Sequence, residues 1–338
     1  MKIFVVGDYR TGTGPANVTK YYIDNLPEGT LYQKRVSKFA RALELIFMIS
    51  KADVILFSGY SRQNILGMKI AKRRGRKCAY LMHGCVEYEN EINGVPDEAM
   101  NATERLTMEL ADRIIAVSGR FAKWLREHYP EHADKIVHVA NGVDISLIRR
   151  TLLEEEAQAL GRDPYKICTV GGGMPRKRIV RICEAIELLK RENSSDEIIT
   201  NLRLEVVGDV GADTDAIRAF PFVKDRGIVP FEETEKMYRN SSLFIQNSSF
   251  ETFGLAPIEA LLCGCSVLLS NEIGALDIIG GLTDSDIIFD CEDIREIADK
   301  IKAILAAPNS DRLIDSTDPE QITWQTRAEE LVQQLETL

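Results

Sequence analysis

Two glutamates, Glu251 and Glu259, lie eight residues apart within residues 248–264. Pro257 suits the first residue of a helix, where its missing N–H is no loss, and Gly264 suits the position just past the helix end. We therefore expect Glu251 in the loop before a helix and Glu259 in its first turn. Free N–H groups at a helix start bind phosphate, and carboxylates accept hydrogen bonds from hydroxyls. The segment therefore favours a ligand that carries both groups, such as a sugar nucleotide, although either glutamate alone is also explained by the helix dipole or by simple solvation.

A second loop combines glycines with cations. Gly171, Gly172 and Gly173 follow an apolar run, and Arg176, Lys177 and Arg178 come soon after. Glycines allow the backbone to approach a ligand closely. Three cations at a helix start oppose the helix dipole, so they indicate a bound anion, most simply a diphosphate. The alternative is a solvated basic turn.

Two further loops are weaker candidates. Gly12, Thr13, Gly14 and Asn17 lie in a glycine-rich turn after the first apolar run. The turn is not a dinucleotide fingerprint, because Asn17 stands where the third glycine would be, and it is equally well explained as a plain strand-to-helix turn. His83 follows another apolar run and could reach a hydroxyl or a phosphate, although a lone histidine is more often a satisfied polar residue.

Short β-branched runs alternate with longer helical patterns along the whole chain. This alternation predicts parallel sheets with helices on both faces, so the fold class is α/β. In such sheets ligands bind beyond the carboxyl ends of the strands, which is where the candidate loops fall. The expected strands are 3–6, 54–57, 78–82, 114–117 and 136–139, then 167–170, 204–207, 243–245, 267–269 and 287–289, with helices at 92–111, 180–192 and 294–305.

Two series of strands predict two Rossmann-like, doubly wound domains. We expect an N-terminal domain at 1–144, an acidic linker at 145–164 and a C-terminal domain at 165–320. Residues 1–144 hold 21 Lys and Arg against 17 Asp and Glu, whereas the whole chain has a net charge of −10. The first half is therefore the one that would face an anionic partner.

Composition limits the class of protein. The 338 residues are 45% hydrophobic and 28% charged, as in an ordinary globular protein, and no apolar run is long enough to span a membrane. The N-terminus reads as a strand rather than a signal peptide, so we expect a cytoplasmic protein. The seven cysteines are best explained as buried thiols, and the four histidines form no metal-binding pattern, with His128 and His132 at a solvated helix end.

Basic clusters mark the first half of the chain. One comprises Lys34, Arg35, Lys38 and Arg41 and leads into the apolar segment 42–49, which we expect to be mostly core. The other comprises Lys69, Lys72, Arg73, Arg74, Arg76 and Lys77. Such clusters can dock on anionic lipid headgroups or can simply be solvated. Nucleic acid is a poorer candidate, because aromatic residues are not interleaved and the chain is acidic overall.

Taken together, these motifs resemble the retaining glycosyltransferases of the GT-B class known as glycosyl transferase group 1, or family 4. The resemblance covers nearly the whole chain, and the pair Glu251–Glu259 is its most specific element. It implies two Rossmann-like domains that face a cleft, with the C-terminal domain binding the donor. It also implies that the last helix, about 322–338, packs back on the first domain.

The resemblance also implies roles for individual residues. Glu251, Lys177 and His83 would be catalytic: Glu251 would hold hydroxyls of the transferred sugar, Lys177 would neutralise the departing diphosphate, and His83 would lie against the donor sugar. Glu259 would hold the ribose hydroxyls. The remaining donor residues would be Thr252, Phe253, Gly254, Leu255, Gly172, Gly173, Arg176 and Arg178, and the acceptor-side and phosphate loop would comprise Gly12, Thr13, Gly14 and Asn17.

The chain departs from the family pattern at three positions. Gly172 stands where the family has arginine, which leaves Arg176 and Arg178 as candidate substitutes. Arg178 stands where glycine is usual, and Asp277 stands where glutamate is usual.

The resemblance implies transfer of a sugar from a nucleotide donor, with UDP favoured and GDP-mannose the other candidate, to a hydroxyl of a glycan or lipid-linked acceptor in cell-surface polysaccharide or glycoconjugate synthesis. Retention at the anomeric carbon, no metal and no cofactor are expected, with a possible anionic membrane surface at the inner face as a partner. The alternatives are a non-catalytic GT-B partner of another transferase and a nucleotide-sugar epimerase.

Overall fold

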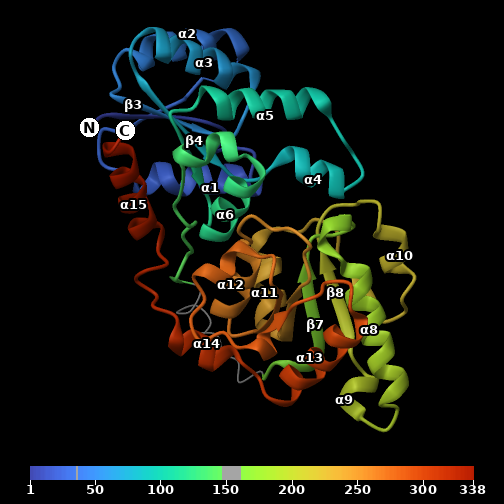
Figure 1. The fold of residues 1–338 in the computed structure, drawn as a ribbon. Coiled ribbons are helices and arrows are strands. Elements are labelled where there is room, and N and C mark those ends of the chain that lie inside the picture. The colour runs from blue at the N-terminus through green and yellow to red at the C-terminus, as the bar shows by residue number, and fades with distance from the viewer. Residues whose placement is uncertain (36, 147–160) are drawn as a thin grey trace. The chain divides into compact units, whose positions relative to one another are not determined.

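The computed structural model describes residues 1–35, 37–146 and 161–338 (Figure 1). The chain divides into two compact units, each with its own sheet. The first comprises Met1–Glu91, Pro96–Gly142 and Glu320–Leu338, and the second comprises Ile92–Val95 and Val143–Pro319. Most of the expected linker, 147–160, lies outside the described residues.

The first unit is built on a parallel sheet in the order β2-β1-β3-β4-β5-β6. Strands β1, β3 and β4 are almost fully buried, as expected for strands covered by helices on both faces. The strands are β1 Ile3–Val6, β2 Leu31–Tyr32, β3 Val54–Ser58, β4 Lys77–Met82, β5 Arg113–Ala116 and β6 Ile136–His138. The helices are α1 Gly14–Asn25, α2 Lys38–Ile49, α3 Arg62–Arg73, α4 Val86–Ile92, α5 Glu98–Leu110, α6 Gly119–His128, the 3₁₀ turn Pro130–Lys135 and α15 Trp324–Glu336.

Helices α2, α3 and α5 lie side by side on one face of this sheet, and α1 and α15 lie together on the other (Figure 1). The C-terminal helix α15 is held by Trp324, whose ring stacks on Tyr21 at 4.7 Å and meets Tyr22 edge-on at 5.4 Å. Arg113 donates to the backbone carbonyl of Gln334 near the end of the same helix. The last helix therefore completes the first unit, although it follows the second unit in sequence.

The second unit has a parallel sheet in the order β12-β11-β10-β7-β8-β9. Helices α8 and α13 pack together against its apolar core, and α11 and α14 each pack on α12. The strands are β7 Asp163–Val170, β8 Arg203–Val207, β9 Val223–Asp225, β10 Ser241–Gln246, β11 Ser266–Ser270 and β12 Ile287–Ile288. The helices are α8 Ile179–Glu192, α9 Glu197–Thr200, α10 Thr214–Arg218, α11 Phe231–Asn240, α12 Leu255–Leu262, α13 Ile294–Ala306 and α14 Ser310–Ser316, with 3₁₀ turns at Pro175–Lys177, Gly274–Asp277 and Asp284–Asp286.

The predicted α/β class and the ten expected strands are confirmed, with ends displaced by a few residues. Two short edge strands, β2 and β9, were not predicted. The expected helix 92–111 corresponds to α5, which begins only at Glu98, while a separate helix, α4, ends at Ile92. The expectation that segment 42–49 is mostly core is wrong in part. Leu45 and Ile49 are buried, but Phe47 is 67% exposed, and Leu43 and Ile46 also face solvent.

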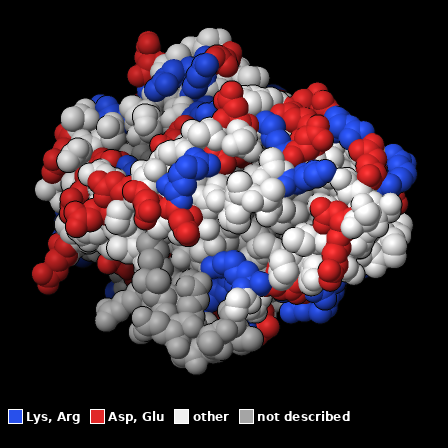
Figure 2. All heavy atoms as spheres, turned by 90° about the horizontal axis from the view of Figure 1, so that it is seen from below, with Lys and Arg blue, Asp and Glu red and all other residues white. Residues whose placement is uncertain are grey.

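The remaining composition-based expectations concern thiols, surface charge and membrane spans. All seven cysteines are free thiols, six of them buried. Acidic and basic side chains are interspersed on the face shown in Figure 2. Across the described ranges, no helix combines the length and the apolar character needed to cross a bilayer.

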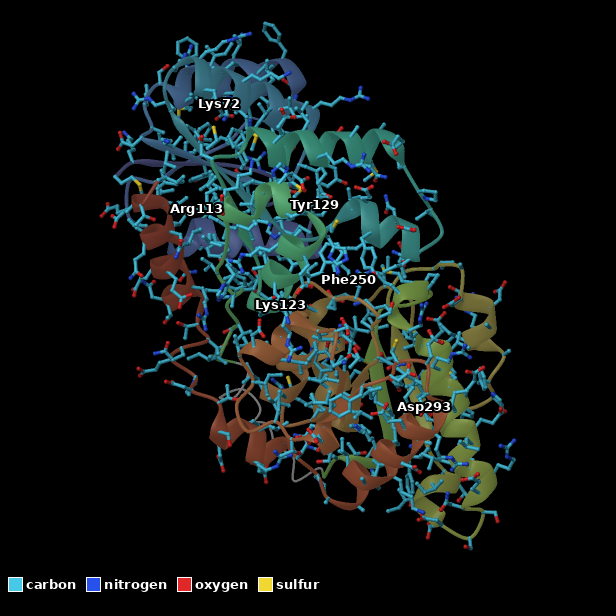
Figure 3. The ribbon with its side chains drawn as sticks, in the orientation of Figure 1. Lys72, Arg113, Lys123, Tyr129, Phe250 and Asp293 are labelled. Atoms are coloured by element: carbon cyan, nitrogen blue, oxygen red, sulfur yellow. The ribbon has the colours of Figure 1, made fainter. Side chains whose placement is uncertain are left out.

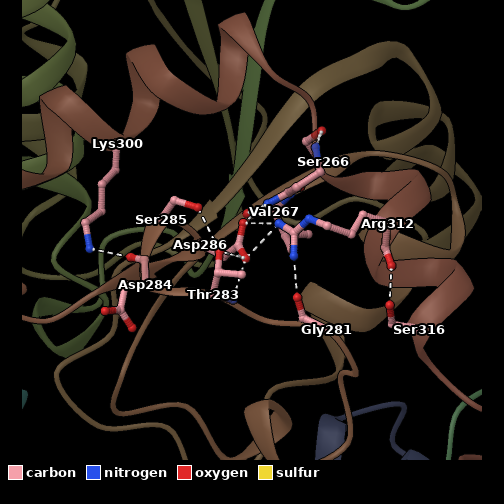
Figure 4. A network of polar contacts seen from close by, with 11 residues as sticks. Ser266, Val267, Gly281, Thr283, Asp284, Ser285, Asp286, Lys300, Arg312 and Ser316 are labelled. Atoms are coloured by element: carbon pink, nitrogen blue, oxygen red, sulfur yellow. Dashed lines mark hydrogen bonds and ion pairs between the residues drawn. The ribbon is translucent and has the colours of Figure 1, made fainter.

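A buried carboxylate fixes the outer part of the second unit (Figure 4). Asp286 is 1% exposed and accepts two hydrogen bonds from Arg312, at 2.8 and 2.9 Å, and one from Asn309 at 2.7 Å. Burial disfavours the ionised form, but the donors together lower the pKa of Asp286. Asn309 also exchanges hydrogen bonds with both backbone groups of Val267. This network ties α14 to β11 and to the turn that precedes β12.

We expect the substitution Asp286→Ala to lower the free energy of unfolding by roughly 2–4 kcal/mol, because Arg312 and Asn309 would lose their acceptor inside the protein. The matched control is Asp284→Ala in the same turn, whose exposed side chain should change stability by no more than about 0.5 kcal/mol. Urea unfolding followed by circular dichroism measures both. Equal effects of the two substitutions would contradict the structural role of Asp286.

Candidate donor and acceptor loops

The second unit brings Glu251, Lys177 and Arg176 together at the carboxyl edge of its sheet. Arg176 donates to Glu251 at 3.1 Å, Lys177 forms a very close ion pair with the same carboxylate oxygen, and Gln246 donates to it at 3.2 Å. The three charged side chains are only 12–13% exposed. Burial alone would raise the pKa of Glu251, but the two cations lower it to about 2. Glu251 is therefore a firmly ionised carboxylate.

The backbone around Glu251 is held by a neighbouring loop. Glu251 and Ile273 form an isolated parallel bridge beyond the ends of β10 and β11. The N–H of Glu251 donates to Glu272 at 3.0 Å, and Phe253 accepts from the N–H of Ala275 at 2.7 Å. These bonds make the loop after β10 a rigid extension of the sheet.

Helix α12 begins at Leu255, not at Pro257 as the sequence suggested. Gly254 precedes it at φ +85°, and a Cβ there would lie 3.1 Å from Cγ of Glu251, so glycine is favoured by both conformation and space. Because Gly254 has no side chain, it cannot cap the first N–H groups of the helix. Thr252 and Phe253 are buried beneath this turn.

Glu259 lies in the second turn of α12, so the expectation of a first-turn position is wrong. Burial, together with the nearby carboxylates of Asp144 and Glu235, raises the pKa of Glu259 to about 7. Glu235 is paired with Arg239 on α11. Glu259 is therefore poised between its neutral and ionised forms near neutral pH, in contrast to Glu251.

The glycines after β7 serve the packing of the chain itself. A Cβ at Gly172 would lie 2.1 Å from the carbonyl oxygen of Asp209, and one at Gly173 would lie 2.0 Å from Oγ1 of Thr214. The N–H groups of Gly172 and Gly173 donate to the carbonyls of Val207 and Asp209. Close approach of the neighbouring loop therefore explains glycine at these two positions, and their role in donor binding stays a prediction.

This packing also explains the departure at Gly172, since no larger side chain fits there. Arg176 takes a place beside Lys177 on Glu251, whereas Arg178 turns to Glu292 at 2.5 Å. The three cations precede α8 on a 3₁₀ turn and at its N-cap, where Arg178 has φ +50°. Two carboxylates of the chain itself, those of Glu251 and Glu292, therefore compensate these cations, as a bound anion was predicted to do.

The first unit holds the remaining candidate residues. His83 follows β4, and its Nε2 lies 2.7 Å from Oγ of Ser58, which in turn lies 2.6 Å from Oγ1 of Thr19 on α1. Burial lowers the pKa of His83 to about 4. The imidazole is therefore neutral at physiological pH, which suits hydrogen bonding to a hydroxyl better than neutralisation of a phosphate.

The glycine-rich turn before α1 is exposed. Gly12 has φ +75°, and no heavy atom lies within 4 Å of a Cβ built on Gly12 or Gly14. Asn17 donates to the carbonyl of Gly12 at 3.3 Å, and Thr13 is the N-cap residue of α1 without a side-chain cap bond. The glycines of this turn are therefore open to an approaching ligand, unlike those after β7.

Sequence reasoning missed several polar residues at strand ends. Ser58 ends β3 and Gln246 ends β10, and each contacts a candidate residue. A polar side chain closing an apolar strand was the signal that could have found them. Figure 3 labels Phe250, which lies in the loop that carries Glu251. The backbone carbonyl of Phe250 accepts a hydrogen bond from Arg176 at 3.1 Å.

The two sheets and the loops at their carboxyl edges define a protein of the GT-B class. Two family models match: Glycosyltransferase Family 4 over residues 5–147 and Glycosyl transferases group 1 over residues 153–318. Together they cover nearly the whole chain, which belongs to the group 1 glycosyltransferase family.

Curated relatives are more distant and longer. A D-inositol 3-phosphate glycosyltransferase from Catenulispora acidiphila is 25% identical over 72% of this chain and 62% of its own length. The serotype-specific mannosyltransferase WbdA of Escherichia coli is 26% identical over 57% of this chain and 24% of its own. The chain thus spans less than two thirds of the length of these relatives.

Solved structures share the fold. Anabaena HepE, in complex with UDP and glucose, has a TM-score of 0.71 at 14% identity and matches all of both chains. Sucrose-phosphate synthase from Thermosynechococcus elongatus has a TM-score of 0.69 at 16% identity, covering 100% of this chain and 98% of that one.

The opposite pKa shifts of the two glutamates give a stability prediction. The folded pKa of Glu259 is raised, so its ionisation costs stability as pH rises from about 4.5 to 7 and above. The substitution Glu259→Gln removes this cost. The difference in free energy of unfolding between the variant and wild type should therefore be more favourable to the variant at pH 8 than at pH 5, by on the order of 1–2 kcal/mol. Thermal unfolding without added nucleotide, at several pH values, measures the difference from wild type.

Glu251→Gln is the matched comparison. The folded pKa of Glu251 is lowered, so its stabilising contribution is present above about pH 4.5 and lost as pH falls toward 2. This variant should be less stable than wild type at neutral pH. If both substitutions shifted stability in the same direction at pH 8, the assigned environments would be wrong.

Proposed function

We propose that this protein is a retaining glycosyltransferase that moves a sugar from a nucleotide donor, with UDP-sugar favoured, to a hydroxyl of a glycan or lipid-linked acceptor. The observation that carries the proposal is the buried cluster of Glu251, Lys177 and Arg176 beside the uncapped start of α12. UDP is favoured because the structural neighbour HepE is described with UDP and UDP-glucose. The activities of the relatives, D-inositol 3-phosphate glycosyltransferase and mannosyltransferase, favour a saccharide or polyol acceptor.

In this proposal, charge on the departing diphosphate is stabilised by side chains and backbone groups of the chain. Lys177 and Arg176 are already fixed by Glu251, so little reorganisation is needed when negative charge develops near them. The first N–H groups of α12 add a positive dipole end. These groups supply the charge stabilisation that a metal ion supplies in other enzymes.

The carboxylates would hold hydroxyls. Glu251 remains ionised over the whole physiological range and would accept hydrogen bonds from the transferred sugar. Glu259 would accept from the ribose, which favours its ionised form and should release a proton on binding near pH 7. The neutral His83 would donate or accept a hydrogen bond at the donor sugar, and the open turn at Gly12 would contribute on the acceptor side.

We expect UDP at about 100 times its Kd to stabilise the protein by roughly 2.7 kcal/mol, a shift of several degrees in Tm. GDP, ADP, TDP and CMP, tested in parallel, identify the base, and uridine tests the need for the diphosphate. The substitution Lys177→Ala should abolish most of the shift. Its matched control is Arg181→Ala, a nearby cation that binds Glu292 instead and should leave the shift intact.

The outcomes separate the candidate functions. A shift with one nucleoside diphosphate that Lys177→Ala removes supports a donor site. If none of the nucleotides shifts the Tm, the donor-site proposal is overturned, and a non-catalytic partner of another transferase is favoured.

We also propose that the first unit docks on an anionic membrane surface. On α2, Phe39, Leu43, Ile46 and Phe47 are exposed, with Phe39 77% and Phe47 67% accessible. On the adjacent α3, Arg62, Leu66, Lys69 and Arg73 are all exposed and follow the spacing of one helix face. An apolar stripe beside cations is the arrangement that binds anionic lipid headgroups and inserts into their boundary.

The protein should therefore cosediment with vesicles containing phosphatidylglycerol and much less with pure phosphatidylcholine vesicles. Phe47→Ser should weaken binding roughly tenfold, since a buried phenylalanine is worth about 1.5–3 kcal/mol. Ile198→Ser, an exposed apolar residue on α9 of the other unit, is the control and should bind like wild type. Equal binding of Phe47→Ser and wild type would contradict the proposal.

A further inference from the structure

A cavity of about 790 Å³ lies in the first unit among α4, α5, α6 and the 3₁₀ turn that follows α6. This volume is within the range of ligand-binding sites. Its lining residues come mostly from helices, whereas the candidate site residues of this unit, His83 and Gly12, lie on loops after strands. Figure 3 shows Tyr129, one of the lining residues, between α4 and α6.

Aromatic rings form one wall of the cavity. His128 stacks on Trp124 with ring centroids 3.9 Å apart and planes 17° apart. Tyr88 lies 4.9 Å from Trp124 and is tilted by 45°. The Nδ1–H of His128 donates to the carbonyl of Trp124 at 2.8 Å, which fixes the orientation of the histidine ring. The wall is therefore preorganised.

The geometry of this wall favours a flat ligand over a small cation. A cage for a quaternary ammonium group surrounds it with several aromatic faces. Here Trp124 and His128 are stacked and cover each other's inner faces, and Tyr88 is tilted by 45–50° against them, so the rings form one packed wall rather than a box of separate faces. A single aromatic wall of this kind suits the apolar face of a sugar ring.

The polar part of the lining carries an excess of carboxylates. Glu87 is held by Arg105, with Nε to Oε2 at 2.8 Å, and it also accepts from Tyr129 at 3.4 Å. Glu91, Glu109 and Glu131 add three carboxylates, while burial and nearby Lys135 lower the pKa of His132 and keep it neutral. This charge disfavours phosphate and nucleotide ligands and provides acceptors for hydroxyl groups.

We infer that this cavity is a second saccharide-binding site that takes an uncharged sugar residue. Aromatic stacking would hold the ring, and the carboxylates and the Glu87–Arg105 pair would hold its hydroxyls. Helix α4 begins three residues after His83, so the cavity and the loop that carries this candidate catalytic residue are adjoining parts of one segment. The identity of the bound sugar rests on the proposed function. It is a non-reacting part of the acceptor glycan.

The chain offers a direct probe, because it contains only two tryptophans, Trp124 and Trp324. The variant Trp324→Phe leaves Trp124 as the sole indole reporter in the cavity wall. We expect its fluorescence to change saturably on titration with at least one of methyl α-mannopyranoside, methyl α-glucopyranoside and N-acetylglucosamine. Introducing Tyr88→Ala into this variant should weaken that binding at least tenfold. A matched Tyr21→Ala change on α1, away from the cavity, should not weaken it.

Other outcomes would overturn the inference. Saturable binding of tetramethylammonium with none of the sugars would make the cavity a cation site. If none of these probes changes the fluorescence, or if sugar binding is unaffected by Tyr88→Ala, the cavity is not a saccharide-binding site. The UDP-induced Tm shift, measured on the same variants, keeps the two proposals apart, since a retained shift with no sugar response refutes the cavity alone.

Discussion

A buried negative charge organises the carboxyl edge of the second sheet. Removing a carboxylate such as Glu251 from water costs several kcal/mol unless partners replace the lost solvation. Lys177, Arg176 and Gln246 provide those partners, and they come from the loop after β7 and the end of β10. The bridge from Glu251 to Ile273 adds the loop after β11. One residue, through its carboxylate and its backbone, therefore fixes three loops relative to one another.

The same segment holds a second glutamate in the opposite electrostatic state. Glu251 is next to two cations, whereas burial and the carboxylates of Asp144 and Glu235 raise the pKa of Glu259. The two pKa values, about 2 and about 7, therefore diverge although both side chains are shielded from solvent. A fixed charge beside cations and a titratable group in an acidic surrounding suit different tasks, which explains why two carboxylates eight residues apart are not interchangeable.

Much of this arrangement could be predicted from the sequence, because buried parallel strands read as continuous apolar runs. The ten predicted strands were found in this way, and the loops after them contain the site residues. The edge strands β2 and β9 were missed because they are short and none of their residues is buried, whereas the equally short β12 contains the buried Ile288. Pairing with a neighbour, rather than local propensity, makes them strands.

Residue environments were harder to predict than elements. Gly172 and Gly173 pack against Asp209 and Thr214, which are distant in sequence, so a glycine-rich loop could not be distinguished from a ligand-binding loop. The choice between Arg176 and Arg178 likewise depended on the positions of Glu251 and Glu292. The exposed face of α2 contradicted the expectation that an apolar helix is core, because burial depends on which helices cover it.

Under the proposed function, the two units contribute different chemistry. Fixed cations lie in the second unit, whereas the first contributes the neutral chain His83–Ser58–Thr19, which can recognise a hydroxyl without attracting the diphosphate.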